Sequence, residues 1–373
     1  MNLHLQDPLD PNAPFLQEKI LETCAGATCG GGAFAFVTKS GVDLLLNDLA
    51  FKAFTTEGNF DLVVGVDEVT NPLALTSLRQ LAGEIDTLQI RVFYHEQPNT
   101  TFHPKFCWFR HKKTAVLITG SGNLTGRAMR GNWEAFTITE FDEKDATALE
   151  DRWAAWTHAH AERLRPLDDP AVIARAEENQ RRARRLGPRL PEPLQEPQPP
   201  ESPAADENIP RPPLAAEGQV AALVAEIPRA GNRWNQANFD LNTFRHFFGA
   251  QPGASHRIVL QHVNDVGELG TMESRPSVSV ASHNYRFELE AASGLQYPRR
   301  GHPIGVFLQI GRRTFRYRLL LPRWPGYSAM RDFLATRYTG RANQMRRVVA
   351  TAADVYQAWP GSPLWREPLQ IED

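Results

Sequence analysis

Apolar and polar positions in the first half of the chain follow two different periods, and they predict strands and helices in turn. Short apolar runs bounded by turn residues predict strands, and they lie at 33–38, 61–67, 88–96 and 132–141. The runs KFCWFR and AVLITGSG, separated by HKKT, predict a β-hairpin. Helical spacing begins at Val42, and again after Asn71, which is placed as an N-cap before Pro72. This alternation predicts an α/β fold, with a mixed sheet flanked by helices.

A change of pattern divides the chain into two domains. Residues 143–186 have helical spacing and complete a first domain, 1–186. Residues 187–214 are rich in Pro and polar side chains that cannot form a packed core, and they predict an extended linker. From 215 to 373, short strands separated by Gly and Pro predict a β-rich, barrel-like domain, in which a terminal helix covers 328–359.

Composition narrows the class of protein. The hydrophobic fraction of 42% and the charged fraction of 23% are those of a soluble globular protein. No apolar run approaches the length that spans a bilayer, and the N-terminus lacks the basic start and apolar core of a signal peptide. The 3 cysteines form no CxxC pair, which argues against a disulfide framework and a zinc site. We expect a cytoplasmic protein that has no membrane association, metal or cofactor.

The net charge of −2 is an average over unlike segments. From Ala215 onward the chain has 19 Arg, no Lys and 13 acidic residues, which leaves an excess of 6 positive charges. Arginine suits bidentate contacts with phosphate and guanine. A GC-rich genome would give the same preference for Arg over Lys, so this bias alone does not decide whether the domain binds nucleic acid.

The candidate chemistry lies between His103 and Glu134. Histidine serves as a nucleophile toward phosphorus because neutral imidazole is abundant near neutral pH. Positions two apart on a strand share a face, so His103 and Lys105 are expected to face one pocket. Ser121 and Asn123, in the sequence GSGN, have the same relation beside the neighbouring strand. Glu134 is placed to orient His103 through the second ring nitrogen.

Together, H-x-K followed by G-S-x-N and a downstream Glu resemble the half-site of the phospholipase D superfamily. The resemblance covers about 32 residues, and the α/β region around them suits the sheet of that family. It implies that His103 is the nucleophile or the general acid, and that Lys105 and Asn123 bind phosphate. Ser121 and Glu134 take supporting roles. The family motif has an Asp five residues after the Lys, where this chain has Arg110.

The order of domains resembles one group within the superfamily. Its members are metal-independent restriction endonucleases that join a phospholipase D-like domain to a DNA-reading pseudobarrel, like that of plant auxin-response transcription factors. The family site needs two histidines facing each other across a two-fold axis, and this chain has one copy of the motif. The resemblance therefore implies a homodimer with a shared site.

Two segments of the second domain have residue types that contact nucleic acid. The loop 231–239 contains types that read or stack on bases, and the strand at 312–318 alternates basic and aromatic side chains. The candidate DNA-binding residues are Arg233, Trp234, Asn235, Gln236, Arg312, Arg316 and Arg318. A packed aromatic turn and an ordinary strand face remain the alternatives for these two segments.

The sequence thus favours a metal-independent endonuclease of restriction or defence type that cleaves double-stranded DNA through a phosphohistidine intermediate. Two alternatives stay open, a lipid or small phosphodiester hydrolase and a DNA-binding protein with a degenerate site. Asp67, which follows a predicted strand, is either catalytic or a satisfied turn residue, and the second interpretation is favoured.

Overall fold

The computed structural model describes residues 1–186, 220–229, 234–251, 256–279 and 285–366. Its first domain is built on a mixed sheet with the strand order β1-β7-β6-β5-β2-β3-β4-β8. The strands are β1 (Asn2–Gln6), β2 (Cys29–Phe34), β3 (Asn59–Gly65), β4 (Leu88–Phe93), β5 (Lys105–Arg110), β6 (Ala115–Gly120), β7 (Glu134–Phe141) and β8 (Leu164–Arg165). β2, β3 and β4 pair in parallel, and the remaining neighbours in the sheet are antiparallel.

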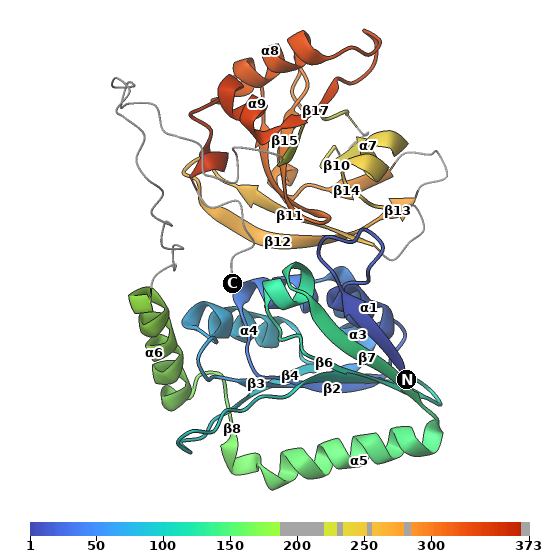
Figure 1. Ribbon diagram of the computed structural model, residues 1–373, viewed down its shortest axis with the longest axis vertical. Helices are drawn as coiled ribbons and strands as arrows, with labels where there is room; N and C mark the ends of the chain where they lie inside the picture. The colour runs from blue at the N-terminus through green and yellow to red at the C-terminus, as the bar shows by residue number, and fades with distance from the viewer. Residues whose placement is uncertain (187–219, 230–233, 252–255, 280–284, 367–373) are drawn as a thin grey trace, which may run out of the picture.

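Helices cover the two faces of this sheet unequally (Figure 1). The helices are α1 (Leu16–Cys24), α2 (Lys39–Leu45), α3 (Leu49–Glu57), α4 (Pro72–Glu84), α5 (Glu143–Ala159) and α6 (Pro170–Leu186). α1 to α4 lie over one face and enclose a core that includes Phe51, Leu62 and Leu75. α5 lies under the opposite face, where only a small cluster around Phe93 and Phe102 is buried.

The expected mixed sheet flanked by helices is confirmed, and so are two local predictions. Asn71 caps α4 by accepting a hydrogen bond from the Ala74 N–H, and Pro72 stands in the first turn. β5 and β6 form the expected antiparallel hairpin. The helix predicted from Val42 is instead divided at Asp48, whose side chain caps a second helix, α3.

The strand predicted at 33–38 lies further upstream, at Cys29–Phe34. Its glycines carry no apolar signal, but they allow close packing on both sides of the strand. A Cβ atom added at Gly31 would lie 2.9 Å from the indole nitrogens of both Trp108 and Trp153. The chain therefore needs glycine where an apolar pattern alone predicts no strand.

The second domain has two hydrogen-bonded sheets in the described residues, in the orders β12-β11-β16-β15-β9-β17 and β10-β14-β13. The strands are β9 (Ala221–Glu226), β10 (Gln236–Phe239), β11 (Arg257–Val263), β12 (Leu269–Pro276), β13 (Val278–Ser279), β14 (Tyr285–Glu288), β15 (Ile304–Gly311), β16 (Thr314–Leu320) and β17 (Arg347–Thr351). The expected β-rich second domain is confirmed. The predicted linker at 187–214 lies outside the described residues.

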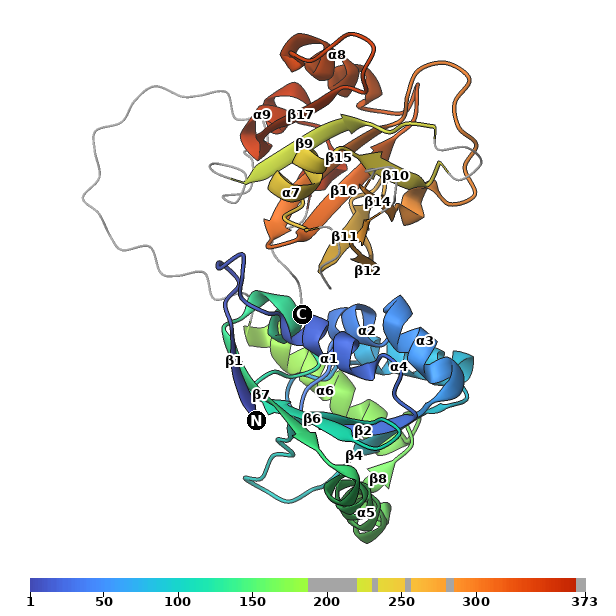
Figure 2. The same cartoon turned by 90° about the vertical axis from the view of Figure 1, so that its right-hand side faces the viewer.

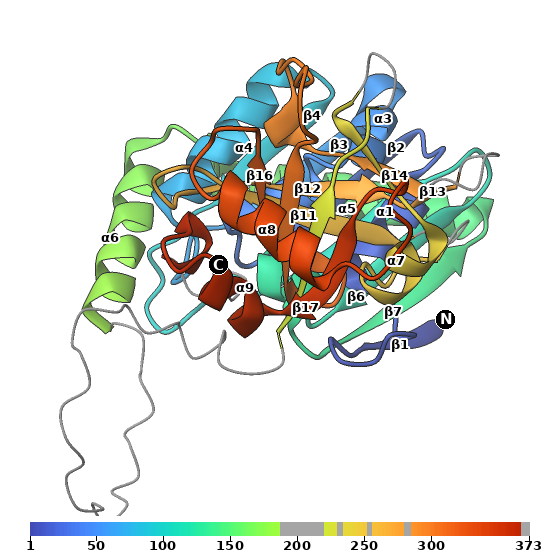
Figure 3. The ribbon, with the colours of Figure 1, turned by 90° about the horizontal axis from the view of Figure 1, so that it is seen from above.

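The terminal helix predicted over 328–359 is wrong. The segment instead forms α8 (Tyr327–Arg337), β17 and α9 (Ala352–Ala358), on the side of the domain remote from the first domain (Figure 1, Figure 3). β17 pairs with β9, so its hydrogen bonds come from a strand that lies more than a hundred residues earlier. The remaining helix, α7 (Leu241–His246), follows β10. No helix among the described residues has the length and apolar character needed to cross a membrane.

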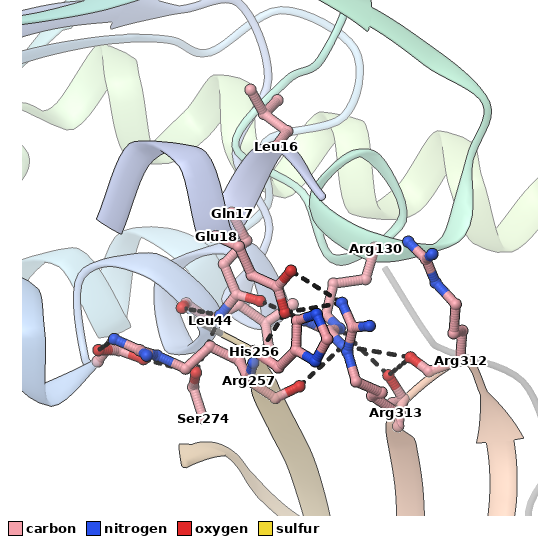
Figure 4. A network of polar contacts seen from close by, with 12 residues as sticks. Leu16, Gln17, Glu18, Leu44, Arg130, His256, Arg257, Ser274, Arg312 and Arg313 are labelled. Atoms are coloured by element: carbon pink, nitrogen blue, oxygen red, sulfur yellow. Dashed lines mark hydrogen bonds and ion pairs between the residues drawn. The ribbon is translucent and has the colours of Figure 1, made fainter. Parts of the chain in front are cut away.

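The two domains contact each other through β11, β12 and the β15–β16 turn (Figure 2). Val259 and Met272 of the second domain extend the apolar core of the first. Around them lies a network of buried charges, shown in Figure 4. The Glu18 carboxylate accepts two hydrogen bonds from Arg313, at 2.9 and 2.8 Å, and lies 3.6 Å from Arg130.

Ion pairs between the two domains compensate the charges that this interface buries. Burial raises the pKa of Glu18, but Arg130, Arg313, the hydrogen bond from the Arg257 N–H and His256 together lower it by more, so that the pKa lies below its ordinary value. A second ion pair joins Arg257 to Asp48, with Nε 3.0 Å from the carboxylate. Removing one partner of a buried pair leaves the other charge without compensation, and the two domains are therefore held together by mutually dependent charges.

Candidate active site

Three strand ends meet at one edge of the first sheet and bring the predicted residues together. His103 precedes β5, Lys105 opens it, Ser121 and Asn123 follow β6, and Glu134 opens β7. The strands are antiparallel, with Phe106 opposite Thr119 and Gly120 opposite Phe136, so the start of β5, the end of β6 and the start of β7 coincide. The convergence that the sequence pattern suggests is therefore present in the fold.

His103 and Lys105 lie side by side at the start of β5. The Lys105 ammonium lies 3.1 Å from each ring nitrogen of His103 and donates to the His103 carbonyl at 3.2 Å. His103 is exposed and Lys105 is partly buried. Burial lowers the pKa of Lys105, and the Glu134 carboxylate opposes this shift. An imidazole and an ammonium, groups that can serve as a nucleophile and as a cation for phosphoryl oxygens, thus stand side by side at the surface.

The Asn123 side chain is held so that its Nδ2 amide group can donate a hydrogen bond to a ligand. Its Oδ1 accepts a hydrogen bond from the Phe36 N–H at 3.2 Å, which turns Nδ2 the other way. The next residue, Leu124, forms a parallel bridge with Val37. The close approach depends on Gly41, where a Cβ atom would lie 2.0 Å from the Leu124 carbonyl oxygen. An amide fixed in this way can donate to a phosphoryl oxygen without reorganising.

Ser121 and Glu134 tie the ends of β6 and β7 together. The Ser121 hydroxyl donates to one oxygen of Glu134 and accepts from the Ala135 N–H at 3.1 Å. Asn132 donates to the other oxygen of Glu134 at 3.2 Å. Both carboxylate oxygens of Glu134 thus bind the loop that carries Ser121 and Asn132, and its role in orienting His103 stays a prediction.

Arg110 stands in the place of the motif Asp, far from the site. It ends β5, five residues after Lys105, which is about 16 Å along a strand. Its guanidinium pairs with Glu150 of α5, Nε to Oε1 at 3.2 Å. The substitution therefore changes how β5 is fastened to α5 and removes no group from the reacting centre.

Phe36 is a site residue that the sequence pattern did not single out. Its ring contacts His103 edge-on at a centroid distance of 5.7 Å, and the Lys105 ammonium lies 6.0 Å from the ring centroid. Phe34 pairs with Lys105 across β2 and β5, which brings the next residues along β2 toward His103. This neighbour could be found only from the strand order.

A cavity of about 670 Å³ opens beside His103 on the α5 side of the sheet. Its walls are aromatic, and the lining includes Phe93, Phe102, Phe106, Trp108, Trp153 and Trp156, together with His103 and Pro104. α5 contributes few buried side chains of its own, namely Ala146 and Thr157. The cavity is thus lined by aromatic side chains, and α5 covers it only in part.

The loop predicted to read bases has a structural role in its described part. Arg233 lies outside the described residues. Trp234 is 5% exposed, donates from its indole nitrogen to the Leu295 carbonyl at 2.7 Å and packs edge-on against Tyr297. The expectation that Trp234 stacks on bases is wrong, because the ring belongs to the domain core. Asn235 and Gln236 are partly exposed, and Gln236 bonds Glu288 at 3.1 Å.

The expected basic strand face is also wrong. Arg316 and Arg318 are 0% and 3% exposed, since β16 lies between β11 and β15 and both of its faces are covered. Arg318 donates to the Val263 carbonyl at 2.8 Å and pairs with Asp265. Arg312 lies in the domain interface, with its guanidinium 3.8 Å from the centroid of the Phe15 ring. Arg316 and Arg318 are buried and cannot contact DNA in the described arrangement, and the partly buried Arg312 is engaged with Phe15.

Comparisons with known proteins bear on the first domain. Residues 50–155 match the family model described as cardiolipin synthase, PLD-like domain. The solved structures that are similar include Nuc from Salmonella typhimurium, a phospholipase D family member, with 16% identity and a TM-score of 0.32 over 44% of this chain and 96% of Nuc. NucT from Helicobacter pylori has 12% identity and a TM-score of 0.29 over 44% of this chain and 97% of its own.

A third similar structure is the N-terminal domain of Helicobacter pylori LlaJI.R1, with 10% identity and a TM-score of 0.25 over 35% of this chain and 97% of that domain. No curated protein matches the chain.

Proposed function

We propose that this chain, whose residues 50–155 match the model of a phospholipase D-like domain, is a metal-independent DNA endonuclease that acts as a homodimer. The observation that carries the proposal is the meeting of His103, Lys105 and Asn123 at one exposed edge of the sheet. These groups supply a nucleophile, a cation and a fixed amide donor, which together suffice for attack on a phosphodiester.

In the first step a ring nitrogen of His103 attacks phosphorus, and a P–N bond forms while the P–O bond to the leaving group breaks. Lys105 and the Asn123 amide bind the non-bridging oxygens, where charge develops. The departing oxygen takes a proton from a second imidazole, the partner's His103. In the second step water gives a proton to that imidazole and attacks phosphorus, and the P–N bond breaks. Restriction-type cleavage of double-stranded DNA is the finer form of this proposal.

The second histidine has to come from another copy, because the described part of the chain has one such arrangement. The aromatic cavity favours a particular face for that copy, since His103 and Trp156 line the same cavity. A second copy docked on the α5 side would cover the partly exposed rings of Phe106, Trp153 and Trp156 and bring two His103 rings toward a two-fold axis. Trp156→Glu is expected to give monomers in sedimentation analysis and to abolish cleavage.

Support for DNA as the substrate comes from the second domain as a whole. Its excess of 6 positive charges remains, although several of its arginines are used within the fold and the interface. Arg299, Arg300 and Arg341 are exposed and available to phosphates. The proposal therefore moves the DNA contact away from β16 toward the exposed arginines of this domain.

A lipid or small phosphodiester is the second candidate substrate, and the aromatic cavity beside His103 is the observation that favours it. Lining of this kind suits an apolar group attached to the scissile phosphate. The two candidates differ in one measurable respect. DNA binding falls steeply with salt concentration, whereas burial of an apolar group does not.

The experiment is cleavage of plasmid DNA by the purified chain in EDTA, with His103→Ala as the inactive control and mapping of the ends. We expect cleavage by the wild type at the same rate with and without chelator. Cleavage that stops in EDTA contradicts the metal-independent mechanism. Turnover of a phospholipid or of bis-p-nitrophenyl phosphate without cleavage of DNA supports the second candidate. DNA binding without turnover of any diester supports a degenerate site.

A further inference from the structure

The segment that carries His103 has few attachments to the rest of the domain. Residues 99–101 before it are exposed, and His103 itself is exposed. Two backbone hydrogen bonds hold its ends. The Pro104 carbonyl accepts from the Ala35 N–H at 2.8 Å, and the Phe102 N–H donates to the Asp67 carboxylate at 3.1 Å. On the N-terminal side of the nucleophile the segment is attached by the Asp67 hydrogen bond and by the buried Phe102 ring, which stacks on Phe93 at a centroid distance of 4.4 Å.

Asp67 is itself held firmly. It is 9% exposed and follows β3 in the turn that leads to α4. Its Oδ1 accepts from Arg175 of α6 at 3.3 Å, and its Oδ2, which binds the Phe102 N–H, lies 3.4 Å from Nε2 of His95. Both ring nitrogens of His95 are buried without a hydrogen-bond partner among the described residues. One carboxylate therefore gathers a backbone N–H, a guanidinium and an imidazole around the base of the His103 segment.

We infer that Asp67 is a positioning residue for His103 in the reaction proposed above. It acts through the Phe102 N–H, one peptide unit before the nucleophile, and has no contact with the reacting atoms. This assignment rests on the proposed function, because positioning has meaning only if His103 attacks phosphorus. It replaces the interpretation of Asp67 as a residue that satisfies its own turn.

The same turn also reaches the other half of the site. The Thr70 hydroxyl donates to the Gly65 carbonyl at 2.8 Å and accepts from the Val37 N–H at 3.1 Å. Val37 bridges Leu124, the residue after Asn123. Asn179 of α6 fastens the turn by donating to the Val66 and Thr70 carbonyls at 2.8 and 2.9 Å. The Asp67–Thr70 turn is thus a common support for the nucleophile and for the amide that binds phosphate.

The test compares Asp67→Ala and Asp67→Asn with a matched control, Asp61→Ala. Asp61 lies on β3 and also binds an arginine and an N–H donor, Arg91 at 2.6 Å and the Trp153 indole at 2.9 Å, but it has no contact with the His103 segment. kcat and KM are measured in EDTA, and folding is checked by thermal melting. Hydrogen exchange of the peptide 97–104 is followed by mass spectrometry.

We expect kcat of Asp67→Ala to fall about 100-fold with KM within about twofold, because misplacing a nucleophile by about 1 Å costs this much. Asp67→Asn, which keeps an oxygen acceptor for the Phe102 N–H, is expected to recover part of that loss. Asp61→Ala is expected to retain the wild-type kcat. Exchange of the peptide 97–104 should rise in Asp67→Ala and stay unchanged in Asp61→Ala.

An unchanged kcat in Asp67→Ala, or an equal loss in Asp61→Ala, overturns the inference and leaves the proposed function intact. If Asp67→Ala does not fold, Asp67→Asn and Arg175→Ala take its place in the same comparison. If the wild type cleaves no diester, the proposed function fails by itself. Hydrogen exchange then decides whether Asp67 fixes the His103 segment, and equal exchange in wild type and variant overturns that claim.

Discussion

Two pairs of nitrogen-bearing side chains stand two positions apart in or beside strands of this chain, and one pair is exposed to solvent while the other is buried. His103 and Lys105 lie at the start of β5, near the surface, with the ammonium 3.1 Å from the imidazole nitrogens. Arg316 and Arg318 lie within β16, between β11 and β15, and are almost fully buried. The same spacing marks the candidate active site in one domain and an interior face in the other.

The difference shows what spacing along a strand can and cannot determine. Residues two apart share a face whatever surrounds them. Whether that face meets solvent depends on the position of the strand in the sheet and on what packs over it. A cation at an open strand end keeps its charge for a ligand, whereas a cation in a central strand must find partners within the protein. Four substitutions compare the exposed candidate site with the buried charges of the domain interface.

The largest effect is expected from His103→Ala. Removal of a nucleophile costs at least about 10⁴-fold in kcat, while an exposed substitution changes the free energy of unfolding by about 0.5 kcal/mol or less. Turnover of plasmid DNA and thermal melting measure the two quantities. His111→Ala is the matched control, because His111 follows β5 at its other end. Retained turnover in His103→Ala rules out this residue as the nucleophile.

Arg313→Met, in the interface between the domains, is expected to lower the stability of the folded chain. It removes the two hydrogen bonds of 2.9 and 2.8 Å to buried Glu18 and leaves that carboxylate with less compensation. Breaking a buried pair from one side costs about 3–5 kcal/mol in stability. Urea denaturation measures this loss. A stability equal to that of the wild type contradicts the structural role assigned to the interface.

Lys105→Met tests the role of the second residue of the exposed pair. The ammonium neutralises charge that develops on phosphoryl oxygens, so kcat is expected to fall about 10²- to 10³-fold, as for loss of a single preorganised donor. Folding should be unaffected, since Lys105 is only partly buried. Lys113→Met, in the exposed β5–β6 turn, is the control. A loss of stability without a loss of kcat would show that Lys105 stabilises the fold and does not take part in catalysis.

The smallest effect concerns the pH dependence of the interface. The pKa of Glu18 is lowered in the folded chain, so its ionised form contributes stability above the unfolded pKa. That contribution is lost as the pH falls through the lowered, folded pKa. The difference in Tm between wild type and Glu18→Gln is therefore expected to be largest at neutral pH and to shrink below about pH 4.5. A difference that grows on acidification contradicts the assigned charge state.

Local rules predicted much of the first domain. Asn71 and Pro72 begin α4 because capping depends on neighbours in the sequence, and the β5–β6 hairpin formed because its turn is short. The prediction of a terminal helix was wrong because the structure of that segment depends on distant residues. β17 receives its hydrogen bonds from β9, and no residue between 328 and 359 contains that information. The N-terminal strand β1, which pairs with β7, was missed in the same way.

The candidate site divides along the same line. The sequence alone identified His103, Lys105, Ser121, Asn123 and Glu134, because the chemistry of each residue and their spacing are local properties. It also established the two-domain pattern and the positive charge of the second domain. The tertiary structure alone decided that Glu134 binds Ser121, that Asp67 accepts a hydrogen bond from the Phe102 N–H, and that Arg316 and Arg318 are interior. These outcomes depend on which strands are neighbours and on what covers each face, and such contacts join residues far apart in the sequence.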